Sequence, residues 1–300
     1  KHSVEREFNW CEDRFVGGAS QLANVLRECT KEKPTYFAQF LRQIPAGANP
    51  DYVRGILSGL HQSEGCDAVC LKEVIRFADH YEKQPFGQEI AYIIKQYPEL
   101  AEEQKILDIL AHYARTGNAN DNAVTIERQK SQPDNISSIS DLSDDFDQLF
   151  TSAINTVRGA SVWALSSVYW EYQTSLSAFM EDFLKERACD ESYKSVRYAL
   201  LELLFPFYNF NRDKCGHILE QLIDSYSEED EVLGLIASAR GRRLVWYLLK
   251  GKTDTGKKLL HRLLNAENKN HKTVGAWLVF NASYCDSDYD DLYNELYNKT

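Results

Sequence analysis

The sequence contains no apolar run close to the roughly 20 residues that a membrane-spanning helix needs. This absence excludes an integral membrane protein. Glycine and proline are also scarce, at 15 and 7 of 300 residues, which excludes collagen-like and low-complexity chains and disfavours turn-rich β-sandwiches. Three motifs of common enzyme classes are missing as well: H-E-x-x-H, G-x-S-x-G and G-x-G-x-x-G.

The cysteines do not form the pattern of a disulfide scaffold. Their number is odd and they are scattered, mostly within helical patterns, which favours a reducing cytosol over a secreted protein. The chain starts at Lys1 rather than at a methionine and shows no signal peptide, so we expect a cytoplasmic fragment of a longer protein. The seven cysteines are Cys11, Cys29, Cys66, Cys70, Cys189, Cys215 and Cys285.

Helical periodicity in short segments is the strongest positive signal. Apolar residues from Phe86 to Tyr97 recur at the spacing of one helix face, and the same spacing runs from Val196 to Leu204. We expect Pro206 to end that second helix. The whole chain predicts an all-α fold of about 14 to 16 helices with short connections.

One polar segment divides the chain. Residues 116–145 hold 7 apolar residues in 30 and no aromatic, too little to offset the entropy of ordering the chain. We therefore expect a flexible loop or linker there. It separates residues 1–115, predicted as irregular helical repeats, from residues 146–300.

The second part contains an internal repeat with a period near 39 residues. Asn155–Ala160 is echoed by Lys194–Ala199, and the same step leads to Leu235 and then Val274. A period near 40 with two helices per unit is typical of HEAT and armadillo repeats. These repeats stack into an α-solenoid because each helix pair has an apolar face that only its neighbours can bury.

Two further details fit HEAT-like units. Asp190 lies six residues before Val196, where we expect its carboxylate to cap a helix while Arg197 bonds a neighbouring helix. The related segment Tyr52–Gly55 is out of register with the later repeats, so the solenoid is predicted to be irregular in its first half.

These motifs resemble a known family. Ala153–Ala160 is similar to the N-[ST]-V-R-G-x-A stretch in the helical regions of large bacterial STAND-type NTPases, which include the AVAST antiviral sensors. Asp190–Phe207 resembles the next repeat of such regions, and Phe40–Leu60 resembles an earlier part. The resemblance implies a sensor whose repeats grip a foreign protein, such as a phage protein, while the nucleotide-binding core and effector lie upstream, outside this chain.

Charge points to a candidate binding site. Residues 240–262 carry eight cations and one carboxylate, a net +7, so the remainder of this −11 chain carries −18. Such a patch steers an acidic partner, although most charge runs are ordinary solvated surface. The residues expected to contact a protein partner, on this patch and on the concave face of the repeats, are Trp163, Trp170, Arg197, Arg240, Arg242, Arg243, Trp246, Lys257 and Lys258.

Three patterns that suggest enzymatic or metal chemistry have simpler interpretations. Gly251–Lys258 nearly matches a P-loop, but Lys258 replaces the hydroxyl that ligates magnesium, so we expect a loop between helices. Cys66 and Cys70 are four residues apart and suit the buried face of a helix better than a metal site. Cys215 and His217 are two residues apart, so on a helix their side chains point in different directions and cannot form a catalytic pair.

We therefore expect no catalytic residue, no cofactor and no metal in this chain. The leading hypothesis is a non-catalytic protein-interaction module. The alternatives are a HEAT-repeat protein that binds nucleic acid through residues 240–262, perhaps with base-processing activity, and a plain assembly scaffold.

Overall fold

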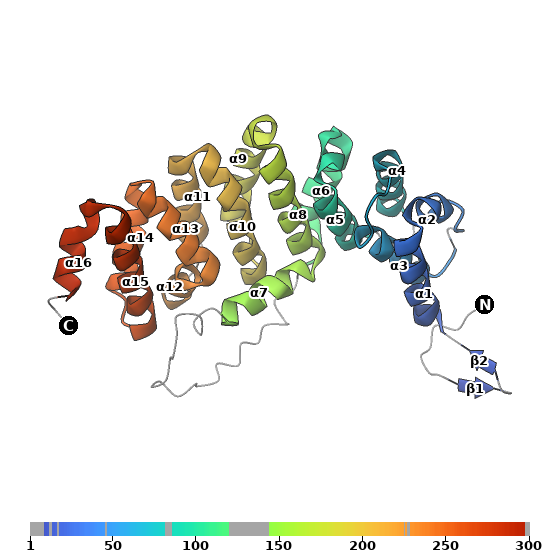
Figure 1. The fold of residues 1–300 in the computed structure, drawn as a ribbon, viewed down its shortest axis with the longest axis horizontal. Coiled ribbons are helices and arrows are strands. Elements are labelled where there is room, and N and C mark those ends of the chain that lie inside the picture. The colour runs from blue at the N-terminus through green and yellow to red at the C-terminus, as the bar shows by residue number, and fades with distance from the viewer. Residues whose placement is uncertain are drawn as a thin grey trace. The chain divides into compact units, whose positions relative to one another are not determined.

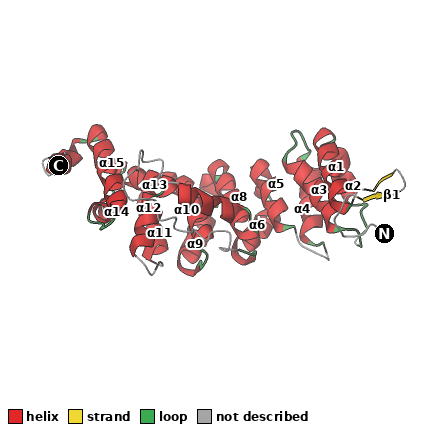
Figure 2. Ribbon diagram, turned by 90° about the horizontal axis from the view of Figure 1, so that it is seen from below, coloured by secondary structure: helices red, strands yellow, loops and turns green. Residues whose placement is uncertain are grey.

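The computed structural model describes residues 9–11, 14–16, 18–45, 47–81, 86–119, 144–224, 226 and 229–297 (Figure 1). Almost all regular structure in these ranges is helical, which confirms the all-α prediction (Figure 2). The exception is a small antiparallel hairpin of β1 (Asn9–Cys11) and β2 (Arg14–Val16), which the periodicity did not predict. Within the described ranges, no helix is both long and apolar enough to cross a membrane. The chain forms two compact units, Lys1–Gly117 and Asn118–Thr300.

The first unit is a set of short helices packed on one another. α1 lies against α3, α3 also contacts α5, and α4 packs against α2, α5 and α6. Its helical elements are α1 (Ala19–Glu32), α2 (Pro34–Leu41), α3 (Pro50–His61), α4 (Ala68–Asp79), α5 (Gly87–Gln96), the 3-10 helix Pro98–Glu102 and α6 (Gln104–Thr116).

The start of α3 shows how local sequence sets these elements. The Asn49 side chain accepts a hydrogen bond from the backbone N–H of Asp51 at 2.9 Å, and Pro50 occupies the first helical position, where no N–H is needed. One turn later, Arg54 bonds Asp51 and reaches Glu89 of α5, each at 2.9 Å. The arginine of the out-of-register motif therefore joins two helices.

The second unit also consists of helices packed on one another, and several of them are longer than any described helix of the first unit. α8, α10, α13 and α15 pack in succession, and α9, α11 and α14 follow each other alongside them, an arrangement compatible with the predicted solenoid. The elements are α7 (Asp144–Ile154), α8 (Val157–Glu171), α9 (Gln173–Asp190), α10 (Lys194–Phe210), α11 (Arg212–Asp224), α12 (Glu229–Ala237), α13 (Ala239–Lys250), α14 (Asp254–Leu264), α15 (Lys269–Cys285), the 3-10 helix Ser287–Tyr289 and α16 (Asp290–Tyr297).

The predicted linker at 116–145 overlaps both units. Residues 120–143 lie outside the described part of the chain. At its edges, Thr116 is the last residue of α6 and Asp144 is the first residue of α7.

A repeated corner joins consecutive helices of the second unit. Between α7 and α8, the Thr156 hydroxyl accepts from the N–H of Gly159 at 3.1 Å, and Ser238 does the same for Gly241 between α12 and α13. The preceding helix comes so close that a Cβ on Gly241 would lie 2.1 Å from the carbonyl oxygen of Leu235. Only glycine fits such an approach.

The corners correct the placement of one repeat. The step of 39 residues leads to Leu235, which lies near the end of α12 rather than at the start of a long helix. The counterpart of the Thr-x-Arg-Gly corner at 156–159 is Ser-x-Arg-Gly at 238–241, 82 residues later (241 minus 159). Arg240 is the arginine of this second corner, as Arg158 is of the first.

Pro206 does not end its helix, contrary to the prediction. It lies inside α10, which continues to Phe210. A proline at this position leaves the carbonyl of Glu202, four residues earlier, without its helical N–H partner. The hydroxyl of Ser166 in α8 donates to that carbonyl at 2.9 Å, so a neighbouring helix supplies the missing hydrogen bond.

Candidate protein-binding surface

The residues predicted to contact a partner are spread over four helices. On α8, Trp163 is half-buried with its ring edge-to-face on Phe150 at 5.6 Å, whereas Trp170 is 48% exposed near the helix end. On α10, Arg197 donates to the backbone carbonyl of Glu191 and lies over the ring of Tyr226, so its guanidinium is engaged with the scaffold. These residues do not form one exposed cluster with α13.

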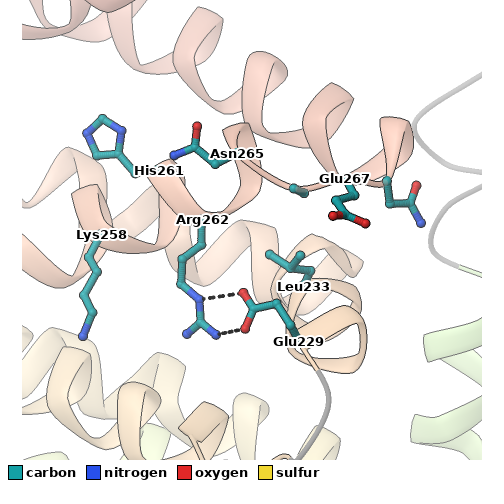
Figure 3. A pocket seen from close by; sticks show the side chains of 9 residues that line it. Glu229, Leu233, Lys258, His261, Arg262, Asn265 and Glu267 are labelled. Carbon is teal, nitrogen blue, oxygen red and sulfur yellow. Dashed lines mark hydrogen bonds and ion pairs between the residues drawn. The ribbon is translucent and has the colours of Figure 1, made fainter.

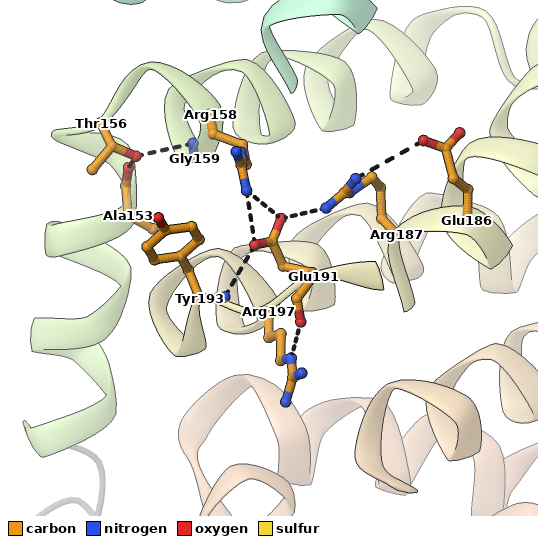
Figure 4. Close-up of polar contacts among 9 residues, drawn as sticks. All are labelled: Ala153, Thr156, Arg158, Gly159, Glu186, Arg187, Glu191, Tyr193 and Arg197. Atoms are coloured by element: carbon orange, nitrogen blue, oxygen red, sulfur yellow. Dashed lines mark hydrogen bonds and ion pairs between the residues drawn. The ribbon is translucent and has the colours of Figure 1, made fainter. Parts of the chain in front are cut away.

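A buried carboxylate organises the region around Arg197 (Figure 4). Glu191 is fully buried and accepts from Arg158 at 3.1 Å, from Arg187 at 2.9 Å and from the backbone N–H of Tyr193 at 3.1 Å. The capping role predicted for Asp190 is not seen, because Asp190 is exposed at the end of α9 and no side chain among the described residues caps the start of α10. This cluster links α8, α9 and α10 and is a structural element.

Four of the eight cations of the basic segment 240–262 pair with carboxylates of neighbouring helices or loops. Arg240 bonds Glu202 on α10, and Lys258 contacts Glu220 on α11 at 3.0 Å. Arg262 forms a fork with Glu229 on α12, at 3.1 and 2.6 Å. Lys252 contacts Asp286 and Asp288 at 2.7 Å each. Much of the run therefore joins neighbouring helices rather than presenting one basic patch. For exposed Lys257 the structure shows no comparable pair among the described residues.

The near-match to a P-loop is a loop between two helices, as expected. α13 ends at Lys250, Lys252 adopts a left-handed backbone with φ of 57°, and Thr253 caps α14 by accepting from the N–H of Gly256. The element directly before this loop is the helix α13, not the strand that a P-loop requires. The loop thus closes a helical corner, and its lysines lie beside carboxylates of the same unit.

The cysteine patterns show no reactive site either. Cys215 is buried in α11, and burial raises the pKa of its thiol, whereas the neighbouring His217 is exposed. Burial also raises the pKa of the Cys66 thiol, which lies just before α4. In the part of the chain that the structure describes, no group of three or more metal-ligating side chains could hold a metal ion.

Two of the four predicted residues on α13, Arg242 and Trp246, share a stripe with Lys250, whereas Arg240 pairs with Glu202 and Arg243 lies over Phe205, both on α10. Arg242, Trp246 and Lys250 are four residues apart and so share a helix face. The Lys250 ammonium lies 5.4 Å from the Trp246 ring centre, within cation–π range. Arg242 lies 5.8 Å from the ring of Trp277 on α15, so the stripe continues onto the neighbouring helix.

α15 adds an exposed aromatic face that the sequence analysis missed. Trp277, Phe280 and Tyr284 follow a helical spacing and are 37%, 54% and 88% exposed. The opposite side of the helix is buried through Val274 and Leu278. The sequence contained a signal for this face, because α15 has apolar residues on two sides. A helix at a protein surface needs only one apolar side to pack on the core, so the second side stays exposed.

The aromatic face is bordered by a further helix and a small cleft. Phe280 lies 6.1 Å from the ring of Tyr293 on α16. A cleft of about 210 Å³ opens where α13 meets the end of α15, and its lining residues are Trp246, Lys250, Ala282, Cys285, Asp286 and Tyr289. The hydrogen bond from Lys252 holds the pKa of Asp286 below its ordinary value, so the one carboxylate in this lining is ionised and already paired.

A larger hollow, of about 820 Å³, lies between α12 and α14 (Figure 3). Lys258, His261 and Arg262 line it from α14, and Glu229 lies opposite. Its charges have both signs and pair with one another, as the Arg262–Glu229 fork shows. The lining of this hollow therefore has no net charge that would attract a charged ligand, whereas α13 and α15 carry cations and no acidic residue.

Comparison with family models, with curated proteins and with solved structures finds no match to this chain. We define the aromatic–basic surface as Arg242, Trp246, Lys250, Trp277, Phe280 and Tyr284.

Proposed function

We propose that the chain is a non-catalytic protein–protein interaction module that binds its partner through the aromatic–basic surface of α13 and α15. The observation that carries this proposal is the row of exposed aromatics on α15. Tryptophan, tyrosine and arginine are enriched among residues that dominate binding energy, because a large rigid ring gains much buried area at small entropic cost. Solvent-exposed rings in a row leave apolar area that a partner would cover.

The same proposal extends to a larger protein. We infer that this module is the ligand-sensing helical-repeat region of a cytoplasmic bacterial STAND-like defence NTPase, with a phage protein as partner. Support comes from the resemblance of Ala153–Ala160 and Asp190–Phe207 to those regions. The reading frame upstream of Lys1 is then expected to encode a strand–G-x4-G-K-[ST]–helix segment. A frame that starts at Lys1 would contradict this extension and leave the binding module intact.

Nucleic-acid binding is the weaker alternative. Affinity for phosphates requires cations that are available to release counterions, whereas Arg240, Lys252, Lys258 and Arg262 are paired with carboxylates. We expect weak binding of single- or double-stranded DNA even at low salt. Tight binding that falls steeply with salt and is lost in Lys257→Glu would favour the alternative.

The proposal is tested by site-specific photocrosslinking in the native host. A photoreactive phenylalanine analogue replaces Tyr284, and a matched variant carries it at Lys185 on α9, which is also exposed. We expect one discrete adduct from position 284 that is absent from position 185. Identical adducts from both positions, or none from position 284, would refute the proposal.

The captured protein is then purified and titrated against the purified chain. Trp277→Ala and Tyr284→Ala are each expected to weaken binding by about 30-fold, the effect of a binding hot spot, with unchanged thermal unfolding because both rings are exposed. ATP hydrolysis by the purified chain, abolished by Lys257→Ala, would contradict the non-catalytic part of the proposal.

A further inference from the structure

The charge of the aromatic–basic surface differs from that of the chain around it. Neither α13 nor α15 contains an aspartate or glutamate, although the chain has 45 acidic residues and a net charge of −11. Together the two helices carry six cations: Arg240, Arg242, Arg243, Lys250, Lys269 and Lys272. The surface is thus a local basic region on an acidic protein.

Arg240 and Arg243 are directed toward α10, through Glu202 and the Phe205 ring, and the other four cations border the aromatic row. Lys269 and Lys272 are exposed in the first turn of α15, before Trp277. Arg242 lies over the Trp277 ring, and Lys250 borders the cleft at the other end of α15. Rim charges of one sign favour a partner segment of the opposite sign through faster association and rejection of like charge.

The spacing of the aromatic row matches a helix. Trp277 and Tyr284 are seven residues apart, about 10.5 Å along the α15 axis at 1.5 Å per residue. A partner helix laid along α15 places its own residues i, i+3, i+4 and i+7 over the same length. Trp246 on α13 shares the small cleft with Ala282 and Cys285 of α15, and Tyr293 on α16 contacts the ring of Phe280.

We propose that the occupant of the aromatic–basic surface is an acidic amphipathic helix of the partner protein, with apolar side chains at i, i+3 or i+4, and i+7 against Trp277, Phe280 and Tyr284. This inference rests on the proposed function and specifies its partner segment. Charge complementarity carries it: a basic helix would meet the like charges of Lys250, Lys269 and Lys272, and neither α13 nor α15 contains an acidic residue.

The probe is a displayed library of random 20-residue peptides selected on the full-length chain. Counter-selection uses the Trp277→Ala/Tyr284→Ala double variant, whose fold is verified by its unfolding curve. We expect enrichment of peptides with net negative charge and apolar residues at helical spacing. Enrichment of basic or non-periodic peptides that depend on Trp277 would overturn the acidic-helix inference while leaving the proposed function in place.

Affinities of the enriched peptides are measured by fluorescence anisotropy at low and high salt. Trp277→Ala is expected to weaken binding about 30-fold, and Lys272→Glu several-fold at low salt with a smaller effect at high salt. Lys185→Glu on α9 is the matched charge reversal and should leave affinity unchanged. Equal effects of Lys272→Glu and Lys185→Glu would overturn the charge argument.

Two other outcomes separate the inference from the function. If the native photocrosslinked protein contacts position 284 through a segment that is neither acidic nor helical, the acidic-helix inference fails and the interaction module stands. If the chain dimerises in solution and Trp277→Ala abolishes the dimer, a second copy is the occupant, and the inference of a separate partner is overturned.

Discussion

Removal of the Glu191 carboxylate is expected to destabilise the second unit strongly. Glu191→Ala deletes the acceptor of Arg158, Arg187 and the Tyr193 N–H. The two guanidiniums remain in place with side chains only 15% and 9% exposed. An ionic group left buried without its counter-charge costs about 3–5 kcal/mol. We expect a loss of that size in the free energy of unfolding.

The chain offers a matched control on its surface. Glu181 also accepts from two cations, Lys185 and Lys214, each at 2.6 Å, but both lysines are about half exposed. Because water replaces the lost partner there, Glu181→Ala is expected to cost about 1 kcal/mol or less. The contrast between the two variants isolates the effect of burial, since the number of ion pairs is the same.

Urea unfolding followed by tryptophan fluorescence suits this test, because four of the five tryptophans lie in the second unit. For a unit of this size, a loss of 3–5 kcal/mol also lowers the melting temperature by roughly 6–20 °C. Joint replacement of Arg158, Arg187 and Glu191 by apolar residues should cost less than Glu191→Ala alone. Equal losses in Glu191→Ala and Glu181→Ala would refute the reasoning.

Three further changes have defined outcomes. Ser166→Ala should lower the free energy of unfolding by about 1–2 kcal/mol, because it leaves the carbonyl of Glu202 without a hydrogen-bond donor. In a Pro206→Ala background the same change should cost almost nothing, because the N–H gained at position 206 reaches that carbonyl. A double-mutant cycle measures the difference. Gly241→Ala should cost about 2–3 kcal/mol in urea titrations because its Cβ meets backbone, whereas Gly47→Ala, with nothing within 4 Å, should be neutral. Burial, with nearby lysines, lowers the pKa of His61, so its protonation favours the unfolded chain. Stability is therefore expected to fall as pH drops below about 6.5 and on through the lowered folded pKa, and His61→Gln should remove that part of the loss.

Several features of the fold were predictable because they depend on neighbours in sequence. Helical periodicity over Phe86–Tyr97 identified a helix, which the structure places at Gly87–Gln96. The short-range pattern of Gly251–Lys258 was sufficient to predict a loop, since its glycine, threonine and lysines form a helix end and a cap within eight residues. In each case the determining interactions lie within one or two helical turns.

The errors share a different cause. Pro206 remains inside α10 because Ser166, forty residues earlier, supplies the missing hydrogen bond. The cap expected from Asp190 is not made, and the buried carboxylate next to it, Glu191, instead pairs with Arg158 of α8 and Arg187 of α9. Ser166 and Arg158 lie 36 and 33 residues from Glu202 and Glu191, the residues that they bond, so a local pattern could not identify these two partners.

For the candidate surface, too, some properties follow from the sequence and others only from the tertiary structure. The sequence by itself determined an all-α chain, the +7 charge of residues 240–262 and the helical spacing of Trp277, Phe280 and Tyr284, because composition and periodicity are properties of the chain. Only the tertiary structure decided which cations are neutralised by carboxylates of neighbouring helices and which aromatic face stays exposed. Pairing and burial depend on which helices pack together, and that packing unites α13 with α15 across more than thirty residues of sequence.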